Sequence, residues 1–524
     1  MRDFKEKITA LLKNLYPLFI PFVSCIFLCF SALGILRHAM WRDEMQAWLL
    51  ARDSRSIPDL LFNMRYEGHP PLWHFLLYVI TRFTCQPAFM QLLHFVIAVL
   101  SAWVFMRFSP FSKLQKVLFI FGYFPLYEYM VISRSYAMGV LFVFIFCALF
   151  PGRTRKYTIL FGLLFLLSQS NFIGAILAIT FGCFLLLEFT AKREEISVSV
   201  KEKDIAMGAC LFVCMIILLI FQTHLPPDTY YSWAPRYLGG INFERIVQTI
   251  SNINRVYMPS FHELKKEFFV ISAGDRLFSA LELLFVVLLF LRKPKVLFLY
   301  VVGVLGLLAF FYLQDGVRLR HHGYLYILLI ACLWLGYYFQ PVDLKSKFFN
   351  RLSITANVYR NLFIIAILLS QFYAGIIVSA EALNEQFSAG KETAQFIKNK
   401  HMDKMIMLGD MGEHIAPIAG YLCNTIYYPK ISRFGSYFLW NRAGFERKIN
   451  QAVIFRDAEK LMLQNRQNVL LILTYELKPD EMTRRLEFIR KFTNSLKREE
   501  IYYLYILPYN KDCLTIREPY ISEK

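Results

Sequence analysis

The sequence predicts an α-helical polytopic membrane protein with a small C-terminal α/β domain, and three observations support this fold class. Of its 524 residues, 56% are hydrophobic and 17% are aromatic, and the mean hydropathy is +0.42. Apolar runs of about 17–22 residues, long enough to cross a bilayer as helices, recur through the first part of the chain. Beyond residue 380 these runs end and the composition becomes that of a soluble protein. We therefore expect a membrane-embedded domain over 1–380 and a soluble domain over 381–524.

Basic loops between the apolar runs predict the orientation of the chain. The formal net charge is +19, and clusters of Lys and Arg recur in alternate loops. Such loops face the cytoplasm in membrane proteins, and the N-terminal segment is basic as well. We expect a multi-pass protein of the bacterial inner membrane or plasma membrane, with a cytoplasmic N-terminus, residues 381–524 outside, and no nucleic-acid partner. The eleven candidate spans are 15–36, 88–106, 114–132, 136–150, 157–170, 171–190, 206–222, 277–291, 295–313, 321–339 and 361–380.

The first outer loop is expected to lie on the membrane surface. The run 69–83 is apolar but only about fifteen residues long, which is short for a span. If it crossed the membrane, every later basic loop would face outwards. Around it, the stretches 45–49 and 57–64 repeat apolar residues at helical spacing and carry charges on their other faces. This pattern predicts interfacial helices in contact with membrane lipids.

The soluble region alternates between helix and strand patterns. Helices are expected at 391–400, 413–422, 445–465 and 479–497, and strands at 404–410, 425–429, 468–474 and 501–508. This alternation predicts a small α/β domain with a largely parallel sheet, to which we assign no chemistry. Most of the ten cysteines lie in apolar runs and are expected to pack as free side chains; a disulfide between Cys423 and Cys513 is the one pairing considered.

Two adjacent carboxylates, Asp43 and Glu44, follow the first candidate span in the segment WRDEMQAW (41–48). They are either solvated charges that end a helix, beside a snorkelling Arg42, or part of a site. The surrounding loop is rich in Trp and Leu, so a carboxylate there loses hydration and its pKa rises towards the range of a general base. We therefore identify Asp43 and Glu44 as candidate catalytic residues and Arg42 as a candidate substrate-binding residue.

Three other stretches on the outer face carry polar candidates. Glu128 and Arg134 occur in YEYMVISRSYAM; an acid in a span is costly and therefore a functional candidate, although the two side chains could simply pair. His69, in GHPPLWHF, either belongs to a rigid turn or is presented at the same surface as the acidic pair. Tyr136 and Asn171 are either helix-end groups or ligands of the substrate.

The segment QDGVRLRHHGYLY places Arg318, Arg320, His321 and His322 before another span on the outer face. Cations are scarce on that face, so these residues are either a membrane anchor or the counter-charge of a bound anion. Guanidinium binds phosphate bidentately and always stays charged, so we predict a phosphate-binding cluster. The sequence contains no P-loop, GxGxxG, HExxH or paired CxxC motif, and we expect no cofactor.

The acidic pair after the first span, the interfacial helices, the GHPPLW segment and the SRSYA corner together resemble the GT-C superfamily of membrane glycosyltransferases, in particular its bacterial PMT-like branch (GT39, ArnT-like). The resemblance covers about residues 15–380. It implies an enzyme that moves a sugar from a polyprenyl-phosphate carrier to a lipid, glycan or protein acceptor on the outer face of the membrane. Within this family the first-loop acid matches Asp43, and the VRLRHH stretch sits where basic residues would meet the carrier phosphate. The second loop departs from the family pattern, because no acid adjoins Arg134 and Glu128 lies six residues earlier.

The residues and the resemblance predict one mechanism. Arg318, Arg320 and Arg134 would neutralise the departing phosphate, and Asp43 would accept the acceptor's proton in an inverting displacement. Some branches of the superfamily use a divalent metal at the paired acids, whereas the monophosphate-carrier branch generally does not, so we expect none. Three alternatives stay open: a polymerase or ligase of lipid-linked glycans; a transporter or flippase, which would need polar residues along a central path; and a structural membrane scaffold that acts through its C-terminal region.

Overall fold

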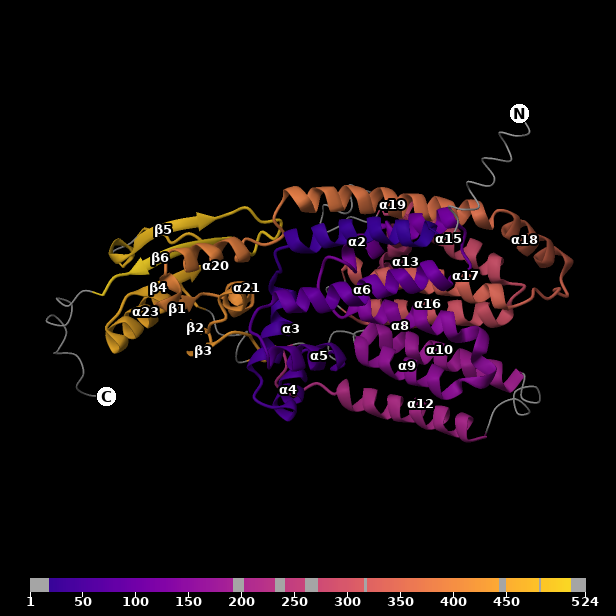
Figure 1. The fold of residues 1–524 in the computed structure, drawn as a ribbon, viewed down its shortest axis with the longest axis horizontal. Helices are drawn as coiled ribbons and strands as arrows, with labels where there is room; N and C mark the ends of the chain where they lie inside the picture. The colour runs from indigo at the N-terminus through magenta and orange to yellow at the C-terminus, as the bar shows by residue number, and fades with distance from the viewer. Residues whose placement is uncertain are drawn as a thin grey trace, which may run out of the picture.

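The computed structural model of the chain describes residues 18–191, 202–230, 241–259, 272–314, 318–442, 449–479 and 482–509. Long helices form a bundle, and a domain built on a β-sheet lies at one end of it (Figure 1). Three short helices lie between the bundle and the sheet domain: α3 (Arg42–Asp53), α4 (Ile57–Met64) and α5 (Leu72–Thr81). These are the short helices predicted for the first outer loop, and the predicted fold class is confirmed.

Seven of the described helices are long and apolar enough to cross a membrane. They are α2 (Phe19–Arg37), α6 (Ala88–Phe108), α8 (Tyr136–Leu149) with the turn after it, α10 (Phe172–Ala191), α12 (Glu202–Gln222), α16 (Pro294–Leu313) and α19 (Arg360–Asn384). Large apolar side chains such as Ile220 and Phe221 in α12 are exposed on the surface of the bundle. An apolar surface of this extent suits contact with lipid, which makes the chain a multi-pass membrane protein.

The predicted span 114–132 is interrupted rather than continuous. It forms α7 (Lys113–Ile120) and a short π-helix, η1 (Phe124–Glu128). Gly122 lies between them, and a Cβ added there would come within 3.1 Å of the Cβ of Gln371 in α19. Close packing of the two segments therefore favours glycine at this position, as is common between membrane helices.

The three remaining predicted spans are helices that are shorter or more charged. They are α9 (Tyr157–Ser170), α15 (Ala273–Phe290) and α17 (Leu319–Leu335). α17 is buried from His322 to Leu335, so it is a central helix of the bundle, and its first turn carries Arg320. Two further helices that were not predicted, α13 (Phe243–Tyr257) and α18 (Lys347–Val358), pack against α15.

The C-terminal domain is a six-stranded sheet covered by helices on both faces. The strand order is β3-β2-β1-β4-β6-β5. The strands are β1 (Ile406–Gly409), β2 (Ile426–Tyr428), β3 (Arg433–Gly435), β4 (Val469–Leu473), β5 (Glu487–Phe492) and β6 (Tyr502–Leu507). Helices α20 (Gly390–Asn399) and α21 (Gly412–Leu422) pack on one face, and α23 (Gln451–Asn465) packs on the other.

Two predictions for this domain are wrong. The sheet is mixed rather than largely parallel, because β1 is parallel to β2 and β4 while the other three pairs of strands are antiparallel. The predicted helix 479–497 contains β5, an edge strand paired with β6. Pairing with β6 takes precedence over the local helical pattern of EFIRKF, and its charged residues suit an exposed edge.

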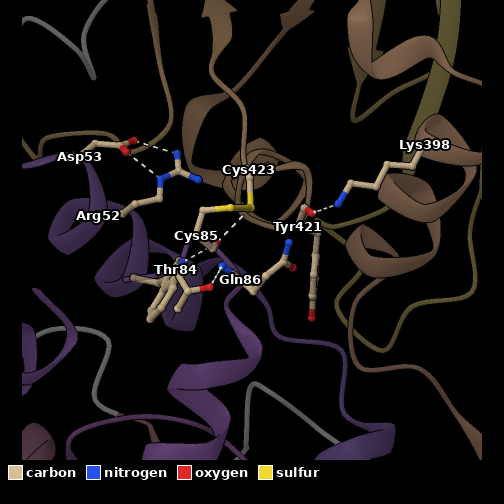
Figure 2. The surroundings of a disulfide bond; sticks show 9 residues. Arg52, Asp53, Thr84, Cys85, Gln86, Lys398, Tyr421 and Cys423 are labelled. Atoms are coloured by element: carbon tan, nitrogen blue, oxygen red, sulfur yellow. Dashed lines mark hydrogen bonds and ion pairs between the residues drawn. A yellow bond between two sulfur atoms is a disulfide. The ribbon is translucent and has the colours of Figure 1, made fainter. Parts of the chain in front are cut away.

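A disulfide joins the membrane domain to the C-terminal domain. Cys85, between α5 and α6, is bonded to Cys423 at the end of α21, with a Cα–Cα distance of 5.7 Å (Figure 2). The pairing of Cys423 with Cys513 is therefore wrong, and Cys513 lies outside the described residues. The disulfide and the contacts between α3 and α21 hold the sheet domain against the short helices α3 and α5.

Candidate active site

The site is built around Asp43, in the first turn of α3. Its Oδ2 lies 2.5 Å from Nη1 of Arg134 and 2.9 Å from Nη2 of Arg320, and its Oδ1 lies 3.6 Å from Nε of Arg42. Arg134 precedes α8 and Arg320 lies in the first turn of α17, so three segments far apart in the sequence converge here. The structure thus brings together the first-loop acid and two arginines that were predicted from separate motifs.

The ion pairs determine the protonation state of Asp43. Burial alone would raise its pKa, but the guanidinium groups of Arg134, Arg320 and Arg42 outweigh burial and hold the pKa at about 2. A carboxylate with so low a pKa is a weak proton acceptor at neutral pH. The geometry therefore opposes the predicted role of Asp43 as the general base and favours a role in orienting the two arginines.

Glu44 points away from Asp43 and is fully buried. Its Oε2 lies 2.7 Å from Nε2 of His38 and accepts a hydrogen bond from the backbone N–H of Trp41, and its Oε1 accepts one from the N–H of Ser133 at 2.6 Å. Successive helical residues are rotated by about 100°, so the two adjacent acids face different surroundings. The structure therefore separates the two acids: Glu44 fixes the turn that carries Arg134, whereas Asp43 pairs with the guanidinium groups.

A small cavity opens beside Asp43. It is lined by Asp43, Ala47, Glu67, His69, Pro70, Trp73, His74, Arg134, Ser135 and Ser170. His69 is thus presented beside Asp43, as one of its two interpretations expected. Glu67, His74, Ser135 and Ser170 were not among the predicted site residues.

Glu67 is the important omission. It stands two residues before His69 in the turn EGHPP, so its position in that motif was the available signal. Gly68 between them has a φ of 64°, in the left-handed region that glycine adopts without steric penalty. This turn places both neighbouring side chains at the cavity.

The titratable groups of the cavity wall differ in charge at neutral pH. Burial raises the pKa of Glu67 to about 7, against the opposing effects of a hydrogen bond from Gln46 and of the charge on Arg134. Burial lowers the pKa of His69 to about 4 and that of His74 to about 3. Both imidazoles are therefore neutral, and Glu67 is the wall residue that changes protonation near neutral pH.

The structure separates the two residues of the second-loop prediction. Glu128 accepts a hydrogen bond of 2.7 Å from the hydroxyl of Tyr123 within the interrupted span, while Arg134 pairs with Asp43. The expected alternative, a direct pair between Glu128 and Arg134, is therefore not the arrangement that the structure shows. Asn171 donates a hydrogen bond of 3.0 Å to the hydroxyl of Tyr324, which places it in the packing of α9, α10 and α17.

The residues of the predicted phosphate cluster at the start of α17 also have different partners. Arg320 forms an ion pair with Asp43. The two histidines pack against aromatic rings instead: the ring centroids of His321 and Tyr136 are 5.6 Å apart, and those of His322 and Phe311 are 4.4 Å apart. The backbone of Arg318 caps the helix, because its N–H donates to His321 and its carbonyl lies 3.1 Å from Nδ1 of His322. The two histidines and Tyr136 therefore support the turn that presents Arg320.

The C-terminal domain, to which no chemistry was assigned, contacts the same turn of α3. The buried carboxylate of Glu500 accepts a hydrogen bond of 2.8 Å from the backbone N–H of Arg42, and Nη1 of Arg42 lies 3.2 Å from Nδ1 of His414. Lys497 lies 4.6 Å from the centre of the Trp41 ring. Arg42 is therefore part of the contact between the domains as well as a neighbour of Asp43. Within the ranges that the structure describes, no three His, Cys, Asp or Glu side chains converge as a metal site would require.

The fold and the site define a polytopic membrane protein that brings carboxylates and arginines together beside a cavity, next to its C-terminal domain. No family model matches the chain, and no curated protein matches its sequence. The structure is similar to ArnT from Cupriavidus metallidurans bound to undecaprenyl phosphate, with a TM-score of 0.45 and 10% identity over 94% of this chain and 98% of that one. For ArnT in the apo state the TM-score is 0.49, with 11% identity over 95% and 98% of the two chains. At 10% and 11% identity, these similarities concern the fold.

Proposed function

We propose that the protein is an integral membrane glycosyltransferase that moves a sugar from a polyprenyl-phosphate carrier to an acceptor on the outer face of the membrane. The observation that carries this proposal is the pairing of Arg134 and Arg320 with one carboxylate, Asp43, beside a cavity. Two guanidinium groups held by one carboxylate keep a net positive charge. Such a site suits the phosphate that departs when the bond from carrier to sugar breaks.

Arg320 has hydrogen-bonding capacity left for a ligand. Its Nη2 donates to Asp43, while its buried Nε has no hydrogen-bond partner in the described part of the chain. A buried donor without a partner costs free energy, and a phosphate oxygen would satisfy it. Arg134 and Arg320 would then hold the leaving phosphate while the acceptor attacks the opposite side of the anomeric carbon. One in-line displacement of this kind inverts that carbon.

The disulfide supports the orientation that we propose. Disulfides persist in oxidising compartments, so the Cys85–Cys423 bond favours an extracytoplasmic position for the first loop and the C-terminal domain. α2 runs from the far end of the bundle to the site, which agrees with an N-terminus on the cytoplasmic side (Figure 1). The positive loops of the sequence favour the same orientation.

Thiol labelling tests this orientation. We expect that Cys85→Ser frees the thiol of Cys423, and that a membrane-impermeant maleimide then modifies Cys423 in intact cells. Lys347→Cys, at the exposed start of α18 at the other end of the bundle, should react only after permeabilisation. Mass spectrometry identifies the labelled peptide. Labelling of both sites, or of Lys347→Cys alone, in intact cells would contradict the orientation.

Release of free polyprenyl phosphate tests the proposed function. Purified protein in nanodiscs is given a panel of polyprenyl-phosphate sugars together with lipid, glycan and peptide acceptors. We expect release from one donor class, and we expect it to continue in EDTA, because the paired arginines supply the positive charge at the phosphate. Loss of activity in EDTA that added Mg²⁺ or Mn²⁺ restores would show that a metal is needed. Turnover of lipid-linked oligosaccharides alone would instead identify a polymerase or ligase.

A further inference from the structure

We infer that Glu67 is the general base that takes the proton from the acceptor, an inference that rests on the proposed function. The two carboxylates of the cavity lie in opposite surroundings. Asp43 is surrounded by three guanidinium groups, whereas Glu67 accepts a hydrogen bond from a neutral amide, that of Gln46. When two acids at one site differ in this way, their proton affinities separate, and the acid with the weaker cationic contacts is suited to proton transfer.

The orientation of Gln46 is determined by the C-terminal domain. Nε2 of Gln46 lies 2.7 Å from the backbone carbonyl of Phe438, and the backbone N–H of Phe438 donates to Oε1 of Gln46 at 3.3 Å. A backbone N–H can only donate and a carbonyl can only accept, so the amide atom that faces the N–H of Phe438 must be Oε1 and the one that faces its carbonyl must be Nε2. Nε2 also lies 2.7 Å from Oε1 of Glu67, so Gln46 presents a donor to this carboxylate. Gln46 is therefore a positioning residue, and Phe438 links the soluble domain to the chemistry.

The charges that face Glu67 place its proton affinity in a useful range. Arg134 and Asp43 act on it with opposite signs, and His69 and His74 in the same wall are neutral at pH 7. Together with burial, these groups give Glu67 a pKa of about 7. A general base works best when its pKa lies near the working pH, because it is then both deprotonated and sufficiently basic.

The chemical step balances without a further reactant. A hydroxyl of the acceptor attacks the anomeric carbon as its proton passes to the Glu67 carboxylate. The bond between the anomeric carbon and the phosphate oxygen breaks, and its electron pair leaves with the phosphate, which Arg134 and Arg320 hold. The product is a new glycosidic bond, with polyprenyl phosphate released and Glu67 protonated. Glu67 then loses its proton to solvent.

The test is the pH dependence of transfer by the full-length protein in nanodiscs. For the wild type we expect the rate to fall below a pH near 7. Glu67→Gln should lower kcat by roughly 10²–10⁴-fold, since it removes a general base. Glu67→Asp should keep part of the activity, whereas Glu487→Gln, an exposed glutamate on β5, should behave like the wild type. The thermal midpoint of each variant shows whether it is folded.

Gln46→Leu tests whether Gln46 acts through the pKa of Glu67, because a purely structural role would not shift the pH profile of the rate. It removes a donor that stabilises the charged form of Glu67, so the pKa of Glu67 rises and the acid limb of the rate profile should move to higher pH. Above that limb the variant should stay active. A folded Glu67→Gln within about threefold of the wild type, or an unmoved limb in Gln46→Leu, would overturn the inference. Absence of release by the wild type from every donor would instead remove the proposed function and this inference with it.

Discussion

Arg134→Ala is expected to lower the rate of sugar transfer by roughly 10²–10³-fold, which is the effect of removing one preorganised donor from a developing negative charge. Arg134 lies 2.5 Å from Asp43 and lines the cavity. The residue before it, Ser133, donates its backbone N–H to Glu44, which holds this turn in place. Its guanidinium therefore sits where the leaving phosphate would be bound. Since the charge on the phosphate grows as the bond breaks, we expect the loss mainly in kcat.

The form of the side chain provides the control for this prediction. Arg134→Lys keeps the positive charge but loses the planar fork that binds two phosphate oxygens, so we expect only partial activity. Arg484→Ala, which removes an exposed arginine from the C-terminal domain, should leave the rate unchanged. Rates are measured in a single turnover with saturating donor. A folded Arg134→Ala with a rate within threefold of the wild type would place the phosphate elsewhere.

The convergence of Asp43, Arg134 and Arg320 could be predicted in outline from the sequence, because the alternation of basic loops placed their three segments on one face of the membrane. The sequence could not predict which of the two adjacent acids pairs with the arginines. Asp43 and Glu44 belong to the same helical turn, and tertiary contacts alone decide which of them is buried. Glu67 was missed because it lies in a loop, where no periodicity distinguishes a residue that faces a cavity from one that faces water.

Features that depend on contacts between distant residues were the hardest to predict. The disulfide spans 338 residues, and nothing near Cys85 in the sequence indicates Cys423 as its partner. The helical pattern around β5 is local, whereas the strand forms by pairing with β6. The apolar run 114–132 reads as one span because its hydropathy is uniform, but it is interrupted at Gly122, where α19 approaches closely.

The contacts of the C-terminal domain indicate that it positions helix α3. It hydrogen-bonds the backbone of Arg42 through Glu500 and orients Gln46 through Phe438. Both contacts reach the first turns of α3, which carry Asp43. The domain therefore holds the acidic helix against the bundle, and the Cys85–Cys423 bond fixes it there.

Glu44→Ala is expected to be the most destabilising single change at the site. Glu44 is fully buried and accepts hydrogen bonds from the backbone N–H groups of Trp41 and Ser133, and it lies 2.7 Å from Nε2 of His38. Alanine would leave all three groups buried without this partner. Each buried donor left without an acceptor costs about 1–3 kcal/mol, so we expect a clearly lower thermal midpoint in detergent.

The same substitution separates a structural role from a catalytic one. Without Glu44 the turn at Ser133 loses its anchor, so Arg134 is misplaced and transfer slows together with stability. Glu44→Gln can still accept a hydrogen bond, and we expect it to recover part of both properties. Because Glu44 does not exchange protons with the substrate in this scheme, the remaining activity of Glu44→Gln should keep the acid limb of the wild type. A Glu44→Gln variant with wild-type stability and no activity at any pH would instead show that Glu44 takes part in the chemistry. A residue with a purely structural role affects activity only when its substitution also disturbs the fold.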